Sequence, residues 1–167
     1  MKKRVLAAVL TLSASGLIAI AQHEGFTDKA IIPTKNDVPT IGFGSTIYPD
    51  DSRVKMGDRI TPQRALVVMK AHIDKDEEAF RRSLKGVSLH QEEFDLYLNW
   101  VYQYGITAWN KSYMLRHLKT GNYKAACDAL LLYKFSGGYD CSTPGNTRCW
   151  GVWDRQLERH STCMESL

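Results

Sequence analysis

A change of residue pattern at Gly57 limits what this chain can fold into. Before it, residues 40–46 alternate β-branched side chains with glycine, residues 30–33 are apolar, and the turn-forming residues 34–37 lie between them. This order is typical of a small antiparallel hairpin. After Gly57, apolar residues recur at helical spacing. A chain of 167 residues is long enough for one domain with a hydrophobic core. The sequence therefore predicts a single α+β domain over residues 1–167, with a small antiparallel β lobe and a larger helical lobe.

Capping residues and glycines set the expected helix limits. A first helix is expected to begin after Ser13 or Ser15 and to run to His23 or Glu24, with Gly25 as its stop. A second begins at Thr61, which caps it, with Pro62 in the first turn, and continues to residue 84. Further helices are expected at residues 88–104, 112–118, 122–133 and 153–163. Residues 135–149 are expected to be a loop, because glycines and a proline interrupt any period there.

Four cysteines, all within the last 41 residues, indicate an oxidising compartment. A zinc site would normally bring a closely spaced cysteine pair, and the sequence has none. Four cysteines allow three pairings. We favour Cys141 with Cys149, closing a short loop, and Cys127 with Cys163, joining two helices.

The N-terminus suggests export. Lys2, Lys3 and Arg4 precede seventeen uncharged residues, 5–21, which is the layout of a signal peptide or a weak signal anchor. The run is short for a stable membrane span, which needs about 20 residues. The alternative interpretation is an ordinary buried helix of the folded domain, the first helix of the chain.

Glu24 is the strongest candidate for chemistry among the acidic residues. The expected helix ends at this residue, beside a glycine, where the negative end of the helix dipole disfavours a carboxylate. Partial burial would act in the same direction. A carboxyl group that keeps its proton near neutral pH can act as a general acid. The alternative is a solvated surface glutamate.

Several motifs occur together in a fixed order. His23-Glu24-Gly25 is followed, after a short gap, by Pro-Thr-Ile-Gly-Phe-Gly-Ser-Thr at residues 39–46. Further matches lie at residues 54–61, between Gln91 and Tyr123, and at residues 151–158. Taken together, these motifs resemble phage-type lysozymes, the endolysins of the T4-lysozyme-like glycoside hydrolase family. The resemblance covers nearly the whole chain after residue 13.

The resemblance implies a lysozyme-like fold with an active-site cleft between the lobes. It also implies a muramidase that hydrolyses the β-1,4 bond between N-acetylmuramic acid and N-acetylglucosamine in peptidoglycan, for bacterial cell lysis. Members of the family act with a glutamate, an aspartate and a threonine. The glutamate corresponds to Glu24 and the threonine to Thr40.

The aspartate of the family has no clear counterpart. Family spacing counted back from the threonine places it at Thr34, and spacing counted forward from the glutamate places it at Pro33. The gap from Glu24 to Thr40 is sixteen residues, one longer than usual, and the only acidic residue between Ala30 and Thr40 is Asp37. Two interpretations stay open: Asp37 acts from a reshaped turn, or the site works with Glu24 and Thr40 alone. Asp37 also suits a purely structural role in a tight turn.

Four further residues are predicted to contact substrate: Thr34, Gly42, Gly44 and Arg155. The two glycines also suit close backbone packing, and the arginine also suits a solvated face. The four tryptophans could stack on sugars, although aromatic residues in a helical lobe more often belong to the core.

Two other functions compete with the muramidase. A lytic transglycosylase would cleave the same bond without water and without an aspartate. A non-catalytic, disulfide-stabilised wall-binding protein would need none of these acidic groups. We expect no cofactor, no metal, no nucleic-acid partner and a monomer. The net charge of +4 suits a polyanionic partner such as the cell wall.

The expected location is the periplasm of the infected bacterium. Some endolysins of the family are first tethered to the inner membrane by a weak N-terminal anchor. Here the uncharged run passes directly into the helix with Glu24, so residues 13–24 cannot be a membrane span and a catalytic helix at once. We interpret this conflict as a switch, in which membrane residence withholds the catalytic helix.

Overall fold

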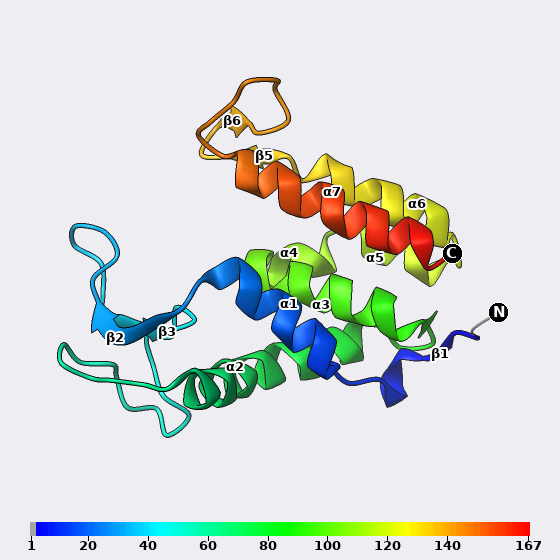
Figure 1. Cartoon of the computed structure of the whole chain (residues 1–167). Helices are drawn as coiled ribbons and strands as arrows, with labels where there is room; N and C mark the ends of the chain where they lie inside the picture. The colour runs from blue at the N-terminus through cyan, green and yellow to red at the C-terminus, as the bar shows by residue number, and fades with distance from the viewer. Residues whose placement is uncertain (1–2) are drawn as a thin grey trace. The chain divides into compact units, whose positions relative to one another are not determined.

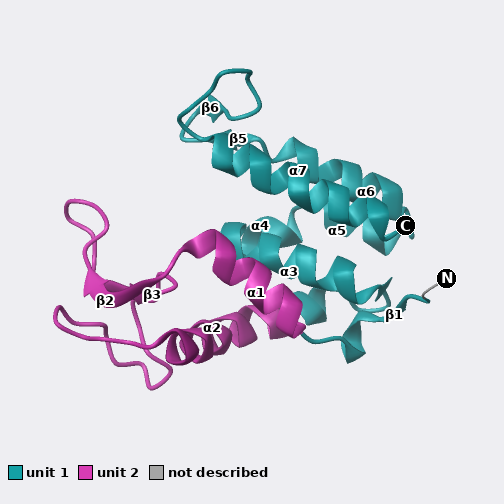
Figure 2. Ribbon diagram, viewed as in Figure 1, with its two compact units in different colours: residues 1–11, 80–167 teal, residues 12–79 magenta. Residues whose placement is uncertain are grey.

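The computed structural model describes residues 3–167, so Met1 and Lys2, the start of the predicted basic region, lie outside the described residues. The chain forms two compact units (Figure 2). Unit 2 is the continuous segment Leu12–Ala79, and unit 1 combines the N-terminal segment up to Thr11 with Phe80–Leu167. The longest hairpin lies in unit 2 and most of the helices lie in unit 1 (Figure 1). The predicted α+β class is confirmed.

Two helices and a hairpin build unit 2. Its elements are α1 (Ala14–Glu24), β2 (Thr27–Ile31), β3 (Thr40–Gly42) and α2 (Pro62–Ser83), the last turn of which belongs to unit 1. The strands pair antiparallel. A small core lies under them, formed by Ala30, Ile41, Val54, Ile60, Ala65 and Val68.

Both predicted helix starts in this unit are confirmed. The Ser13 hydroxyl accepts the backbone N–H of Gly16 at 3.0 Å, which makes Ser13 the cap of α1. The Thr61 hydroxyl accepts the N–H of Arg64 at 3.3 Å at the start of α2. Each cap satisfies a backbone donor that the first turn of a helix leaves open. The sequence therefore defines these boundaries locally.

Helices, one small hairpin and one pair of strands distant in sequence build unit 1. Its elements are, in chain order, β1 (Val5–Leu6), η1 (Ala7–Val9), β4 (Ser88–Leu89), α3 (Gln91–Tyr104), α4 (Ile106–Asn110), α5 (Tyr113–Lys119), α6 (Tyr123–Ala129), η2 (Leu130–Leu132), β5 (Phe135–Ser136), β6 (Tyr139–Asp140) and α7 (Trp150–Glu165).

Aromatic side chains fill the centre of unit 1. The ring of Trp109 lies 5.0 Å from that of Phe80, 5.4 Å from that of Tyr97 and 6.1 Å from that of Trp100, measured between centroids. All four side chains are fully buried. The indole N–H of Trp109 donates to the Ser83 hydroxyl at 2.8 Å, so the burial of this polar group is compensated.

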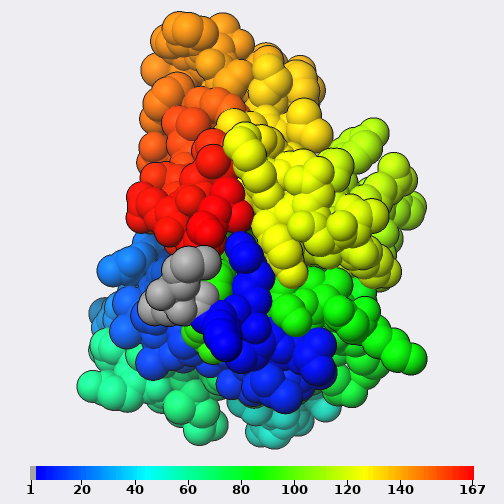
Figure 3. All heavy atoms as spheres, turned by 90° about the vertical axis from the view of Figure 1, so that its right-hand side faces the viewer, coloured from blue at the N-terminus to red at the C-terminus, as the bar shows by residue number. Residues whose placement is uncertain are grey.

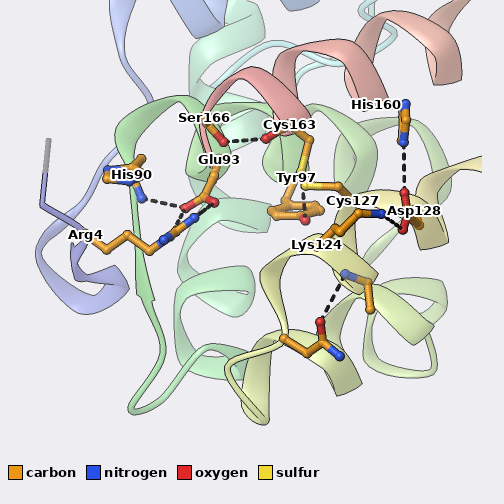
Figure 4. Close-up of a disulfide and its surroundings, with 12 residues drawn as sticks. Arg4, His90, Glu93, Tyr97, Lys124, Cys127, Asp128, His160, Cys163 and Ser166 are labelled. Carbon is orange, nitrogen blue, oxygen red and sulfur yellow. Dashed lines mark hydrogen bonds and ion pairs between the residues drawn. A yellow bond between two sulfur atoms is a disulfide. The ribbon is translucent and has the colours of Figure 1, made fainter. Parts of the chain in front are cut away.

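The N-terminal segment is part of the folded unit 1. Strand β1 pairs with β4, with Val5 opposite Leu89. The guanidinium of Arg4 donates to both carboxylate oxygens of Glu93 at 2.7–3.2 Å (Figure 4). It also lies 3.8 Å from the centroid of the Tyr123 ring. Glu93 is buried and also accepts the backbone N–H of His90. Arg4, predicted as part of an export region, therefore anchors the chain end to α3.

The uncharged run at residues 5–21 is not one helix. It forms β1 and η1 before α1 begins. Along residues 3–167, no helix combines the length and the apolar character needed to cross a bilayer. The space-filling view shows the N-terminal segment, in blue, beside the end of α7, in red (Figure 3). A pocket there is lined by Lys3 and Arg4 together with Glu165, Ser166 and Leu167.

Two disulfides join the pairs that the sequence favoured. Cys127 of α6 bonds to Cys163 of α7 (Figure 4), and Cys141 bonds to Cys149. The first links two helices, and the second closes the loop between β6 and α7.

Some sequence predictions were wrong in detail. The segment expected to be a loop contains the β5–β6 hairpin, which turns through Gly137 and Gly138, both at positive φ. The helix expected from residue 88 begins at Gln91, because residues 88 and 89 pair with β1. Helix α4 was not predicted. The β1–β4 pairing depends on residues that are distant in sequence, which a local pattern does not report.

Candidate active site

Glu24 is the last residue of α1. Gly25 follows with φ of +70°, a conformation that favours glycine, and leads the chain into β2. The predicted position at a helix end is confirmed. The predicted partial burial is wrong, because Glu24 is exposed. Its carboxylate lies at the C-terminal end of α1.

Phe26 is a residue at this turn that sequence reasoning missed. Its ring lies 5.4 Å from that of Phe43, which follows β3. The contact ties the segment after Glu24 to the end of the hairpin. The sequence did contain a signal for this contact: one aromatic residue directly follows Glu24-Gly25, and a second lies between Gly42 and Gly44.

The hairpin β2–β3 contains an irregularity. Thr27 is opposite Gly42 and Ile31 is opposite Thr40, so four steps along β2 correspond to two along β3. The middle of β2 bonds instead to residues 58–60: the N–H of Ala30 donates to the Asp58 carbonyl, at 3.0 Å. This bulge gives β2 more residues than a regular pairing with β3 would hold.

The turn before β3 brings Thr34 and Asp37 together. The N–H of Asp37 donates to the Thr34 carbonyl at 3.0 Å, and Asn36 has φ of +71°, which this residue type tolerates. The Thr34 hydroxyl donates to one carboxylate oxygen of Asp37 at 3.3 Å, and the N–H of Val38 donates to the other at 2.8 Å. The carboxylate is exposed, but its orientation is fixed.

Thr40 opens β3 three residues after Asp37. Its hydroxyl donates to the Ile31 carbonyl across the hairpin, at 3.4 Å. A hydroxyl has one donor and two acceptor positions. Its donor is directed to the strand, so its lone pairs remain for a group that donates to it, such as a water molecule.

Gly42 and Gly44 have different surroundings, although both were predicted to contact substrate. Gly42 is buried, with φ of +65°, and a Cβ atom there would lie 2.8 Å from the Cβ of Ala65 on α2. Gly44 has φ of +82°, and a Cβ atom there would meet nothing within 4 Å. Close approach of β3 to α2 therefore requires glycine at position 42.

We expect Gly42→Ala to lower the free energy of unfolding by about 2–5 kcal/mol, which combines the cost of a left-handed residue with that of overpacking. Gly44→Ala is the matched control, with the backbone cost alone, about 1–2 kcal/mol. Urea unfolding measures both. Ala65→Gly should partly rescue Gly42→Ala, and equal losses for the two glycine variants would contradict the packing role of Gly42.

The remaining predicted contacts lie in unit 1. Arg155 is on α7, whereas Glu24, Thr34, Asp37, Thr40 and both glycines belong to unit 2. Among the tryptophans, Trp100 and Trp109 are core residues, and Trp150 is 45% exposed at the start of α7.

Solved structures identify the class of protein. The chain is similar to the endolysin of Escherichia coli O157:H7 phage FAHEc1, with a TM-score of 0.80, 27% identity and coverage of 95% of this chain and 96% of that one. A mutant of P22 lysozyme gives the same TM-score and identity, over 93% of this chain and 99% of that one. The fold is therefore lysozyme-like.

Sequence comparison identifies the family. Residues 21–150 match the model described as Phage lysozyme, and the chain belongs to this family. It is 33% identical to the endolysin of Salmonella phage P22 over 129 residues, which cover 77% of this chain and 87% of that protein. It is a lysozyme, a glycoside hydrolase that lyses the bacterial cell wall.

Proposed function

We propose that the chain hydrolyses the β-1,4 bond between N-acetylmuramic acid and N-acetylglucosamine with Glu24, Asp37 and Thr40 as its catalytic residues. The family supports the reaction. The hairpin that begins three residues after Glu24 supports the assignment of residues, since it carries a hydrogen-bonded Asp37 and Thr40.

Glu24 acts as the general acid. Its carboxyl group donates a proton to the glycosidic oxygen while the bond from that oxygen to the anomeric carbon breaks. The sugar then passes through an oxocarbenium-like transition state, which a nearby carboxylate stabilises. Glu24 is left as a carboxylate and recovers a proton from solvent, to which it is exposed.

Asp37 and Thr40 act on the nucleophilic water. A water molecule that donates one hydrogen to the Asp37 carboxylate and the other to the Thr40 hydroxyl has its lone pairs directed away from both. Its oxygen forms the new bond to the anomeric carbon, on the face opposite the leaving group, and its proton passes to Asp37. This mechanism inverts the configuration at the anomeric carbon.

The observation that carries the role of Asp37 is the orientation of its carboxylate. Thr34 and Val38 each occupy one position on a different oxygen. An ionised carboxylate has about four such positions, so each oxygen retains one for water. Family spacing leads to Thr34 or Pro33, which are not acidic. Asp37, three residues before Thr40, supplies the acidic group instead.

Asp37→Asn tests this role. The amide keeps an acceptor for Val38 and a group that can pair with Thr34, so the turn should persist. We expect kcat on purified peptidoglycan to fall about 100-fold or more, because the variant has no general base. Thr40→Ala should also lower kcat. Thr34→Ala is the control that removes only the support of Asp37, with a loss below about fivefold. Wild-type kcat in Asp37→Asn would leave Asp37 as a turn residue.

Mass spectrometry of the products separates hydrolysis from transglycosylation in the same digests. Hydrolysis adds water, so the muropeptides should have reducing ends. Anhydro-muropeptides would contradict a mechanism in which Asp37 and Thr40 hold water.

The proposed place of action is the periplasm of the infected bacterium. Two disulfides support an oxidising compartment. If residues 5–21 first insert into the inner membrane, α1 cannot pack in unit 2, because its first eight residues belong to that run. Such a tethered form would be inactive until its release.

A further inference from the structure

The loop between η2 and α7 is cross-linked and hydrogen-bonded, although Cys141 is its only buried residue. The Cys141–Cys149 disulfide closes it. The backbone N–H of Cys141 donates to the Lys134 carbonyl at 2.8 Å, and the side-chain amide of Asn146 donates to the Asp140 carbonyl at 2.9 Å. We call residues 134–149 the stapled loop.

Asp140 is the centre of the hydrogen bonds in the stapled loop. Its carboxylate accepts the ammonium of Lys134 at 2.7 Å, and the hydroxyl and N–H of Ser142 at 2.6 and 2.9 Å. The hydrogen bond from Lys134, followed by that from Ser142, lowers the pKa of Asp140 to about 2. The acidic residue of this loop is thus already paired with one of its two cations, Lys134.

The second cation, Arg148, is held on Tyr139. Its guanidinium lies 4.5 Å from the centroid of the Tyr139 ring and donates through Nη1 to the phenol oxygen. The backbone N–H of Arg148 donates to the side chain of Asn146 at 2.8 Å. Both Tyr139 and Arg148 are exposed. Within residues 3–167, no ion pair joins Arg148 to a carboxylate, and its hydrogen bond to Tyr139 uses Nη1, so the edge formed by Nε and Nη2 is left for a ligand.

An oriented guanidinium with an open edge fits one class of ligand. Its parallel N–H groups match the two oxygens of a carboxylate. Because the tyrosine ring and the disulfide already hold the side chain, binding would cost little further ordering. The ring of Tyr139 also offers an apolar face beside the charge. The geometry points to an organic carboxylate as the ligand.

We propose that Arg148 and Tyr139 form an accessory site that binds the carboxylates of peptidoglycan stem peptides. This proposal rests on the proposed function, which makes peptidoglycan the substrate. The stem peptides are the part of the wall that carries carboxylates on amino acids, whereas the glycan backbone between them is largely neutral. The site would hold the enzyme on peptide-bearing regions of the wall.

A second arginine–tyrosine pair provides a matched control. Arg116 lies over the ring of Tyr113, 5.2 Å from its centroid, on helix α5. Both residues are exposed. No hydrogen bond joins this guanidinium to the phenol oxygen, and no disulfide holds the segment. Arg116→Ala removes the same charge without removing an oriented site.

Binding to purified sacculi tests the proposal, with full-length Glu24→Gln protein so that the wall is not digested. We expect Arg148→Ala to raise the Kd for intact sacculi about three- to fivefold, the range of an exposed ion pair. Tyr139→Phe keeps the ring but removes the oxygen that accepts the hydrogen bond from Arg148, and it should raise the Kd less. Arg116→Ala should leave it unchanged. The thermal midpoint of each variant shows whether the exposed substitutions preserve the fold.

Sacculi whose carboxylates are converted to amides, with a carbodiimide and ammonia, identify the ligand, because the glycan and the stem peptides stay in place and only the carboxylates are lost. Arg148→Ala and its parent should bind the amidated sacculi equally. Equal binding of the two proteins to intact sacculi would overturn the proposal. An equal loss on the amidated sacculi, or an equal effect of Arg116→Ala, would also overturn it. Wild-type digestion separates the two proposals. If the wild type releases reducing ends but binding does not depend on Arg148, the accessory site alone is rejected. If binding depends on Arg148 but the wild type does not hydrolyse the wall, the proposed function alone is rejected.

Discussion

Glu24→Gln should lower kcat on peptidoglycan by about 1000-fold or more, with little change in folding. The amide cannot donate a proton to the leaving oxygen, and general acid catalysis typically contributes 100- to 10,000-fold. Glu24 is exposed and ends α1, where a negative charge opposes the helix dipole. The side chain of Glu24 is exposed and the substitution keeps its size, so the thermal midpoint of the variant should stay close to that of the wild type.

Two assays measure this effect: the turbidity of outer-membrane-permeabilised cells and the release of reducing ends from purified sacculi. Glu78→Gln, an exposed position on α2, is the control for the loss of a negative charge. Retention of more than a tenth of the wild-type rate by Glu24→Gln would remove Glu24 from the mechanism. Lysis by this variant at the wild-type rate would support a non-catalytic wall-binding protein.

Loss of the Cys127–Cys163 disulfide should strongly destabilise the folded chain. The bond spans 36 residues, and closing a loop of that length restricts the unfolded chain by about 4 kcal/mol. Both cysteines are fully buried, and the Tyr97 hydroxyl lies 3.3 Å from the Cys163 sulfur. Cys127→Ala/Cys163→Ala also removes this contact.

The other disulfide is the internal comparison. Cys141 and Cys149 are eight residues apart, so their loss should cost about 2.5 kcal/mol by the same reasoning. Urea unfolding of the two double-alanine variants, with and without dithiothreitol, measures both costs. Each double-alanine variant keeps one disulfide, so dithiothreitol should lower its free energy of unfolding only by the cost of that remaining bond. A larger cost for the Cys141–Cys149 pair would contradict the account based on loop length.

Much of unit 2 was predictable from local chemistry. Ser13 and Thr61 cap their helices as expected, and Gly25 ends α1 directly after Glu24. Caps and stops involve residues three or four positions apart, so the sequence itself contains both partners. The position of Glu24 at a helix end and of Thr40 at a strand start followed from such signals together with the family resemblance.

The second carboxylate was only partly predictable. Spacing directed attention to Thr34, and composition directed it to Asp37. The structure joins the two by a hydrogen bond, because Asn36 allows the turn that returns the chain onto itself. The bulge in β2, where the strand bonds to residues 58–60, lies between Glu24 and this turn. The number of extra residues in the bulge could not be predicted from the sequence of either strand alone.

The sequence by itself determined the family, the helix caps, the positions of Glu24 and Thr40 and the favoured cysteine pairs. Tertiary structure decided the rest. It showed that Arg4 binds Glu93, 89 residues away, although a basic N-terminus predicts export. It also showed that Gly42 is required by Ala65 and that Arg148 is held by Tyr139 with an open edge. The physical reason is that caps, turns and periodicity arise from neighbours along the chain. Ion pairs, close packing and oriented side chains depend on partners that only folding brings together.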